Sequence, residues 1–393
     1  MRSIIIIYLF ISSLQSFGQR LVKSHVPELK LLSLDSSYNW LDEIFGEQIA
    51  TDVKFVGLGE FTHGGMETIL FKSKMIQYLV REKGYRQVLL EYPNVALHPL
   101  NDYLKRKNSS NLDSATIIAQ ELFERTFLSN TSFYNLITWI KQYNLTHPDD
   151  TINLRGIDIE GASAGLADYF MQHYLLPIDR SHALEISSKW GTAIKDSLVM
   201  AEVDWFKKNH GMLEERLGKT AYQNLGYDFE AAKDKLTHDS LQKINIYKAS
   251  AFRDSVMAAY TVAFGGPKSI IWSHNIHVTT SDYVVSLGNY LKKIIGNQYY
   301  SVLTDFSHNA TVWSISNKGE LSKKTYISND KTVAYKLGKK QGIGQGVLFF
   351  DDLKASQTRV NYIDRAGNQM VFGRGHTFDA LVVFNDVEPF MFR

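Results

Sequence analysis

Five ionisable residues in this sequence come at or just after the ends of short apolar runs, and these runs lie far apart in the chain. An acid in that position is often only a helix cap or part of a solvated turn. Several titratable groups gathered in one cleft are instead typical of an enzyme that moves protons. We therefore expect these five side chains to converge on one hydrolytic site: Glu60, His63, Glu91, Asp158 and His274.

His63 carries the most chemical information of the five. It lies in the glycine-flanked segment 59–65, directly before a predicted helix. The positive end of a helix favours the neutral imidazole, which can accept a proton. Nearby carboxylates would orient the ring and stabilise the imidazolium that forms, and the candidates are Glu60, Glu67 and Glu91. We predict that His63 is a general base that activates water; the alternative is a histidine that only caps its own helix.

The segment 272–277 supplies two more imidazoles, His274 and His277, at the end of a predicted strand. One of them could polarise a carbonyl group, or the pair could bind a metal ion. His-x-x-His without an adjoining glutamate is a weak metal signal, and a zinc site would need carboxylates from elsewhere. We expect no cofactor, and a divalent metal stays the open alternative.

A competing mechanism is indicated by residues 161–165, which read Gly-Ala-Ser-Ala-Gly and fit the G-x-S-x-G pattern of a nucleophile elbow. An acid and a histidine follow in the matching order as Asp305 and His376. However, two acidic residues separate this motif from the preceding apolar run, whereas an elbow springs directly from its strand. A serine hydrolase that uses Ser163 is therefore the alternative and not the leading hypothesis.

The elements that position these residues begin with a strand, a helix and a second strand. Residues 53–58 and 86–90 form short apolar runs, and apolar residues recur at helical spacing from 66 to 84. We expect the two strands to form a parallel pair through a right-handed crossover. Further predicted strands are 151–157, 269–273, 300–304, 347–350 and 380–384.

This alternation predicts an α/β fold with a mainly parallel central sheet flanked by helices. In such a sheet, ligands bind beyond the carboxyl ends of the strands. Between about residues 165 and 264 helical spacing dominates, and no linker rich in proline, glycine or serine sets this stretch apart. We interpret it as a helical insertion that covers the active-site cleft of a single catalytic domain over residues 19–393.

The first residues predict export. Arg2 precedes an apolar run from Ile4 to Ile11, and small residues follow around Gly18. This pattern is typical of a signal peptide at 1–18, because the run is far shorter than the roughly 20 residues that cross a bilayer. We expect a periplasmic or secreted protein without stable membrane insertion after cleavage.

Composition excludes several other classes. The 393 residues include 43 lysines and arginines against 41 acids, without a long basic run that would track phosphates, so we expect no nucleic acid partner. The chain has no cysteine, which removes thiolate nucleophiles, disulfides and cysteine metal sites. The expected partner is a small-molecule ester or lactone, and the oligomeric state stays open.

The sequence resembles the erythromycin esterase family. The matching segments occur in family order and span nearly all of the chain after the signal peptide. They are GLGEFTHG at 57–64 with Glu67, LE at 90–91, GID at 156–158, RDSVMA at 253–258 and SHNIH at 273–277. The resemblance implies a hydrolase that opens the lactone ring of macrolide antibiotics without a serine nucleophile.

The resemblance also implies roles for individual residues. His63 matches the water-activating base, and Glu60, Glu91 and His274 match other active-site positions. Macrolide esterases of the family are expected to carry an arginine where this chain has Lys72, which keeps the charge but lacks the planar fork, so substrate positioning would differ. The candidates for binding substrate or supporting the site are Glu67, Lys72, Asp158, Arg253 and His277.

A non-enzymatic alternative is also open. The same cleft could bind a small ligand or a cell-envelope glycan, and its polar residues would then be hydrogen-bonding partners rather than catalysts.

Overall fold

The computed structural model describes residues 38–391 except for 108–110, 125, 164–165, 167–174, 191–194, 316–320, 342–345, 354–357 and 365–366. The predicted signal peptide lies outside the described residues, as do the last two residues of the 161–165 motif. No helix in the described part of the chain is long and apolar enough to span a membrane.

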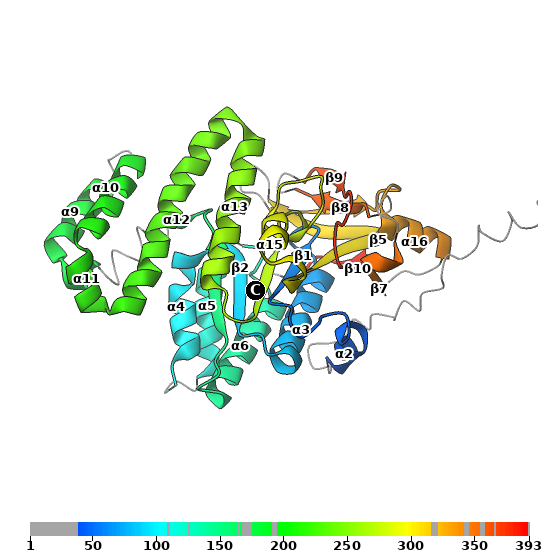
Figure 1. The fold of residues 1–393 in the computed structure, drawn as a ribbon, viewed down its shortest axis with the longest axis horizontal. Helices are drawn as coiled ribbons and strands as arrows, with labels where there is room; N and C mark the ends of the chain where they lie inside the picture. Colours follow the sequence, from blue (N-terminus) through cyan, green and yellow to red (C-terminus); the bar gives the residue numbers. More distant parts are fainter. Residues whose placement is uncertain are drawn as a thin grey trace, which may run out of the picture.

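An eight-stranded sheet forms the centre of the fold (Figure 1). Its strands follow the order β3-β2-β4-β1-β5-β10-β7, and β6 pairs with β5. Neighbours from β3 to β10 are parallel, whereas β7 and β6 are antiparallel additions, so the predicted α/β class with a mainly parallel sheet is confirmed. The strands of this sheet are β1 (Phe55–Glu60), β2 (Gln87–Pro93), β3 (Asn153–Asp158), β4 (Ser269–His274), β5 (Tyr299–Ile315), β6 (Leu321–Ile327), β7 (Gly346–Phe349) and β10 (Ala380–Val387), and a small separate sheet pairs β8 (Val360–Ile363) with β9 (Gln369–Phe372).

The prediction that β1 and β2 pair directly is wrong, because β4 lies between them. β1 pairs with β4 and β5, and β2 pairs with β3 and β4. An apolar pattern identifies a strand, but it does not specify which of several similar strands fills the position beside it. The strand order changes direction around β4, and in open α/β sheets the crevice at such a switch point is the usual ligand site.

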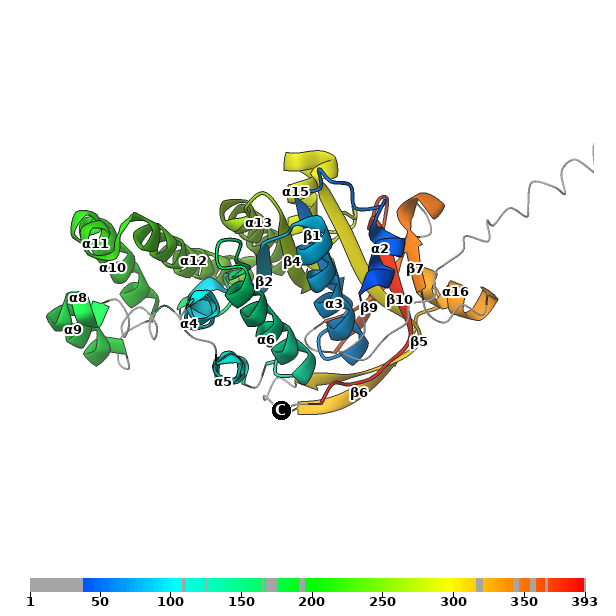
Figure 2. The ribbon, with the colours of Figure 1, turned by 90° about the horizontal axis from the view of Figure 1, so that it is seen from below.

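Helices cover both faces of the sheet, because successive strand residues point to opposite faces. Val88 and Leu90 pack in one buried cluster with α3 to α6, whereas Leu89 packs in another with α13 and α15 (Figure 2). Burial on both faces explains why these strands read as continuous apolar runs. The helices are α2 (Asn39–Phe45), α3 (Met66–Lys83), α4 (Asn94–Lys105), α5 (Leu112–Phe123), α6 (Thr131–Thr146), α8 (Leu176–Ile178), α9 (Arg180–Trp190), α10 (Lys195–Lys208), α11 (His210–Leu217), α12 (Lys219–Ile244), α13 (Ile246–Phe264), α14 (Asn275–Val278), α15 (Leu287–Ile295) and α16 (Val333–Gln341).

α3 confirms the helix predicted at 66–84. Gly84 ends it in the left-handed conformation with φ 75°, and the Gly84 amide donates to the carbonyl of Leu79. Most of the helix is buried between the sheet and its neighbours. α3 therefore gives a fixed boundary to the loop that carries His63.

The stretch predicted as a helical insertion contains α8 to α13. Helices α9 to α11 pack with α12 around a third apolar cluster, at the end of the molecule away from β7 (Figures 1 and 2). α13 runs back from this group and packs against β3 and α15. This stretch therefore reaches the central sheet through α13. The single-domain assignment stays a prediction.

Gly156 provides a test of how closely β3 approaches the end of β2. A Cβ atom at this position would lie 2.1 Å from the carbonyl oxygen of Tyr92 and 2.5 Å from the amide nitrogen of Asn94. Neither backbone can move without disturbing the β2–β3 pairing. We expect Gly156→Ala to lower the free energy of unfolding by about 1–3 kcal/mol, the usual cost of overpacking a core. Urea denaturation followed by circular dichroism measures this change.

Gly211→Ala is the matched control, because no atom lies within 4 Å of the Cβ position of Gly211. Gly211 lies in α11, where alanine should be neutral or slightly stabilising, since it forms helices better than glycine. Equal stability of the two variants would contradict the role assigned to Gly156.

Candidate active site

The carboxyl ends of four neighbouring parallel strands bring predicted residues together. Each strand supplies one of them at or near its end: Glu60 in β1, Glu91 in β2, Asp158 in β3 and His274 in β4. Glu60 and His274 are level with each other across the β1–β4 pair. α13 adds Arg253, and the short α14 adds His277. Segments far apart in the chain thus meet at the switch point of the sheet.

Glu60 connects His63 to a buried lysine. One carboxylate oxygen of Glu60 bonds Nδ1 of His63, and the other accepts a hydrogen bond of 2.9 Å from Nζ of Lys72. Lys72 is completely buried and also donates to the carbonyl oxygen of Ser273 at 3.2 Å. The lysine supports Glu60 from the side opposite to His63.

The bond to Glu60 determines which ring nitrogen of His63 carries the proton. Burial would raise the pKa of Glu60, but Lys72 and then His63 lower it, to about 2. Burial lowers the pKa of Lys72 to about 8, although Glu60 opposes the change, so both partners are mainly charged at neutral pH. An ionised carboxylate only accepts hydrogen bonds. Nδ1 of His63 therefore carries the proton, and its Nε2 is free to accept another.

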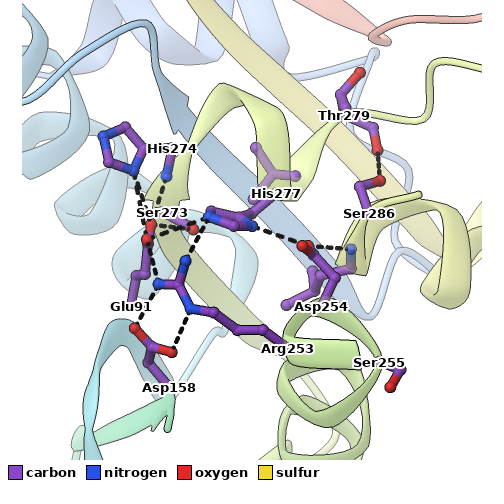
Figure 3. Close-up of polar contacts among 12 residues, drawn as sticks. Glu91, Asp158, Arg253, Asp254, Ser255, Ser273, His274, His277, Thr279 and Ser286 are labelled. Atoms are coloured by element: carbon purple, nitrogen blue, oxygen red, sulfur yellow. Dashed lines mark hydrogen bonds and ion pairs between the residues drawn. The ribbon is translucent and has the colours of Figure 1, made fainter. Parts of the chain in front are cut away.

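Glu91 accepts hydrogen bonds from β4 and α13 and faces a further donor on α14 (Figure 3). Its Oε2 accepts from Oγ of Ser273 at 2.6 Å and from the amide of His274 at 2.9 Å. Its Oε1 accepts from Nη2 of Arg253 at 2.9 Å, and Nε2 of His277 lies 3.3 Å away. Burial opposes ionisation, but His277 and His274 hold the pKa of Glu91 well below its usual value. Both oxygens are occupied, so Glu91 is an anchor rather than a proton acceptor.

His277 is held as an imidazolium between two carboxylates. Its Nδ1 bonds Oδ1 of Asp254 at 2.9 Å, and its Nε2 faces Glu91. Burial would lower the pKa of His277, but Asp254 and then Glu91 raise it to about 10. Asp254 also accepts from the amide of Leu287 at 2.8 Å, which ties α13 to the start of α15. The 3.4 Å contact between Nε2 of His277 and Nη1 of Arg253 joins two donors, so it is proximity and not a hydrogen bond.

Arg253 forms a two-point ion pair with Asp158. Its Nε and Nη2 atoms donate to the two carboxylate oxygens at 2.8 and 2.6 Å. Burial opposes the charge, yet Asp158 and then Glu91 raise the pKa of Arg253 well above its usual value. Within the described residues, Nη1 has no carboxylate partner. Arg253 can therefore still donate hydrogen bonds to a bound molecule.

The imidazoles of His63 and His274 lie against each other, with ring centroids 3.8 Å apart. Burial and then the nearby His63 lower the pKa of His274, so this ring is neutral at neutral pH. Nδ1 of His274 lies 3.3 Å from the ionised Glu91, which places the ring proton there and leaves Nε2 as an acceptor. In this form His274 cannot donate a hydrogen bond from Nε2 to an oxyanion.

The cluster carries one more negative charge than positive when His63 and His274 are neutral. Four carboxylates face three cations: Glu60, Glu91, Asp158 and Asp254 against Lys72, Arg253 and His277. A proton taken up by His63 would balance this charge. The cluster can therefore compensate one further positive charge.

The residues of this cluster, except Lys72 and Asp254, line a pocket of about 390 Å³, which is within the usual range for small-molecule sites. His63, Glu91 and Arg253 are among its polar lining residues, while Phe127 and Tyr362 add aromatic surface. Phe127 stacks on His63 with ring centroids 5.0 Å apart, and Tyr362 meets His274 edge-on at 6.1 Å. A polar floor with an aromatic wall suits a substrate whose polar reactive group is attached to an apolar body.

Not all predicted residues line this pocket. Glu67 accepts a hydrogen bond of 2.8 Å from the amide of Glu388, so it fastens the carboxyl-terminal segment to α3 rather than orienting His63. Lys72 does not line the pocket and acts through residues that do, which are Glu60 and Ser273. Of the predicted insertion, Arg253 on α13 is the residue that lines the pocket.

Sequence reasoning missed several residues of the site, among them Ser273, Asp254, Phe127 and Tyr362. Ser273 and Asp254 lie directly beside two predicted residues, so the same matching segments could have identified them. Phe127 and Tyr362 lie in segments without a motif, and only tertiary packing brings them to the pocket.

The residues of the serine-hydrolase alternative do not form a triad in the described part of the chain. Asp305 is buried and accepts a hydrogen bond of 2.8 Å from Nδ2 of Asn361. His376 pairs with Asp379 at 3.2 Å. The hydroxyl of Ser163 is buried, and no described residue forms a hydrogen bond with it. Ser163 thus lacks the adjacent base that would activate it as a nucleophile.

Two overlapping sets of side chains have the spacing to hold a metal ion. They are Glu60, His63 and His274, and Glu91, His274 and His277, and in each set the candidate ligand atoms lie within 4.8 Å of one another. A metal-ligating nitrogen must be free of its proton. His277 has both nitrogens protonated, and Lys72 already balances the charge of Glu60. The protonation of His277 disfavours a metal in the second set, and the ion pair with Lys72 disfavours one in the first.

Comparison with known families and structures gives consistent results. A family model described as erythromycin esterase matches residues 80–335. A search of curated proteins finds no match.

Three solved structures have a similar fold. A protein from Bacillus cereus is 19% identical, covers 94% of this chain and 96% of its own, and has a TM-score of 0.69. A succinoglycan biosynthesis protein is 20% identical, covers 97% and 99% of the two chains, and has a TM-score of 0.70. A mutant of the erythromycin esterase EreC in its open conformation is 18% identical, covers 93% and 98%, and has a TM-score of 0.68. At these identities the structures show the fold alone.

The raised pKa of His277 predicts a pH effect on stability. A group whose pKa is raised in the folded state contributes stability that is complete below its unfolded pKa and is lost as the pH rises through the folded value. For His277 this window runs from 6.5 to about 10. We expect the wild type to lose stability relative to His277→Gln between pH 6.5 and 8; Lys72, whose pKa is about 8, is present in both proteins, so its own titration affects both curves. Urea denaturation at several pH values measures the difference, and parallel curves for the two proteins would contradict the assignment.

Proposed function

This chain belongs to the erythromycin esterase family, and we propose that it hydrolyses a carboxylic ester or lactone with water activated by His63. The observation that carries the proposal is the bond from Nδ1 of His63 to the ionised Glu60, which leaves Nε2 as a proton acceptor in the pocket. The substrate class is that of a small molecule with an ester or lactone group, for which a macrolide ring is the first candidate.

In the proposed reaction, Nε2 of His63 takes a proton from water while the oxygen attacks the substrate carbonyl. Glu60 stabilises the imidazolium, and its own charge is supported by Lys72. The excess negative charge of the cluster acts in the same direction. The proton then returns from His63 to the leaving alcohol, so acid and base are the same residue.

Arg253 is the proposed donor to the oxyanion. Its Nη1 is not used by Asp158 or Glu91, and it lines the pocket. A preorganised cationic donor of this kind stabilises charge as it develops on the carbonyl oxygen. Tyr362 is a second donor candidate, because burial and then Glu91 raise its pKa and keep its hydroxyl protonated. His274 is proposed as a second proton acceptor beside His63.

We further propose that the enzyme is exported, works as a hydrolase without a metal cofactor and has no nucleic acid partner. The export proposal rests on the pattern of residues 1–18. The metal-free proposal rests on the paired charges of Glu60 and Glu91 and on the protonation of His277.

His63→Asn tests the proposed base. We expect turnover to fall by about 100- to 10,000-fold, the usual contribution of a general base, while the thermal unfolding temperature stays close to that of the wild type. Mass spectrometry of mature protein incubated with macrolides and simpler lactones detects the product as a gain of one water.

His308→Asn is the matched control, because His308 is an exposed histidine on β5 that pairs with Asp386 outside the pocket. It should retain full activity. Near-normal turnover by His63→Asn would remove His63 from the mechanism, and binding of the whole panel without any product would favour the non-enzymatic alternative.

A chelator tests the metal-dependent mechanism, and a covalent active-site label tests the serine mechanism. We expect activity to be unchanged after dialysis against EDTA and a fluorophosphonate probe to leave Ser163 unlabelled. Loss of activity that added zinc or manganese restores would establish a metal mechanism. Labelling that disappears together with activity in Ser163→Ala would establish the serine mechanism.

A further inference from the structure

We propose that a basic cleft beside the β8–β9 sheet binds a small anion that carries several negative charges. The cleft has a volume of about 730 Å³. Its lining includes three cations, Lys331, Arg359 and Arg374, from the turn before α16, the residue before β8 and the loop after β9. No carboxylate is among the lining residues in the described part of the chain.

The three cations stand out because no acidic residue in the described part of the chain neutralises them. Within the described residues, none of them forms an ion pair with Asp or Glu. Elsewhere in this protein, arginines near acids are paired, as in Arg86 with Asp150 and Arg253 with Asp158. Like charges that converge on one cavity repel each other unless an anion compensates them. The arrangement therefore favours a bound anion.

The loop that carries Arg374 is held in place by its backbone. The Arg374 amide donates to Oγ of Ser281 at 2.9 Å, and its carbonyl accepts from the amide of Asp282 at 3.1 Å. Gly373 has φ 138°, and a Cβ there would lie 2.4 Å from the carbonyl oxygen of Thr358. Only glycine permits this close approach. The backbone that carries the Arg374 side chain is therefore held in one position.

The other two cations also start from ordered backbone. The carbonyl of Arg359 accepts from the amide of Val333 at 2.9 Å, and the amide of Lys331 donates to Oδ1 of Asn329 at 3.0 Å. The amide of Asn329 in turn donates to Oδ1 of Asn361 at 3.2 Å. Fixed backbones lower the entropy lost when the side chains close on a ligand. The cleft is thus preorganised around its charge.

The cleft is separate from the active-site pocket, because the two share no lining residue. Phe372 lines the cleft and Tyr362 lines the active-site pocket, and their rings meet edge-on with centroids 6.3 Å apart. The anion site therefore lies behind the aromatic wall of the catalytic site.

The chemistry of the lining sets the class of ligand. Two guanidinium groups and an ammonium group suit phosphate, sulfate or clustered carboxylates, since arginine binds such groups with two parallel hydrogen bonds. The exposed ring of Tyr283 and the side-chain amide of Asn329 offer further contacts. A singly charged ion would leave most of the positive charge uncompensated, so we infer a ligand with at least two charges.

Isothermal titration calorimetry with pyrophosphate and with citrate tests the site. We expect the full-length wild type to bind at least one of the two at low salt, more weakly at 150 mM salt because the charges are screened. Arg359→Gln combined with Arg374→Gln should weaken binding by tenfold or more. Binding of pyrophosphate alone would indicate phosphate chemistry, and binding of citrate alone carboxylate chemistry; both outcomes support the site.

Lys219→Gln combined with Lys248→Gln is the control, because it removes the same charge from exposed positions on α12 and α13. The control should bind like the wild type. Circular dichroism verifies that both double variants are folded. Absence of binding of either probe to the wild type, or an equal loss in the two double variants, would overturn the proposal.

Discussion

Two largely buried carboxylates at the ends of β1 and β2, the strands on either side of β4, are the constraint on which the rest of the site depends. Glu60 and Glu91 lie where β1 and β2 leave the sheet, and an ionised carboxylate removed from water is costly unless a cation and hydrogen bonds compensate it. A helix supplies each cation: α3 supplies Lys72 for Glu60, and α13 supplies Arg253 for Glu91. Loss of Lys72 would leave Glu60 with a buried charge and no lysine to compensate it. Glu91, in contrast, would keep His277 at 3.3 Å after loss of Arg253. The ion pairs therefore fix α3 and α13 against the sheet as well as setting the charge of the site.

The same pairing determines which nitrogen of each histidine can react. Because Glu60 and Glu91 stay ionised, they face the protonated Nδ1 atoms of His63 and His274. Both rings therefore present Nε2 as an acceptor. His277 differs because it lies between two carboxylates, Asp254 and Glu91, and is fully protonated. Three histidines in one site thus have two different chemical states. Their carboxylate neighbours decide which state each one has.

The sequence predicted which segments form strands better than it predicted which strands lie side by side. The apolar runs that end in Glu60 and His274 identify strands, and parallel packing then requires their ends to meet at one edge. The position of β4 between β1 and β2 could not be predicted, because several strands share the same apolar pattern. Residues beside a recognised motif, such as Asp254, could have been predicted as part of the site. Tyr362 could not have been predicted, because it reaches the pocket through the packing of the small β8–β9 sheet. Such packing produces no local pattern in the sequence.

The floor and the wall of the pocket have different consequences for function. The floor consists of charged residues that form ion pairs with one another. A substitution there would therefore affect the protonation and charge of the site more than its shape. Lys72 supports this floor from behind, since it is completely buried and bonds Glu60 and the carbonyl oxygen of Ser273. The aromatic wall of Phe127 and Tyr362 comes from loops and from β8 and is free of such pairing. A substrate preference that differs from macrolides would therefore arise from this wall, whereas a lysine in place of arginine at position 72 would mainly affect the charge that Glu60 offers to His63.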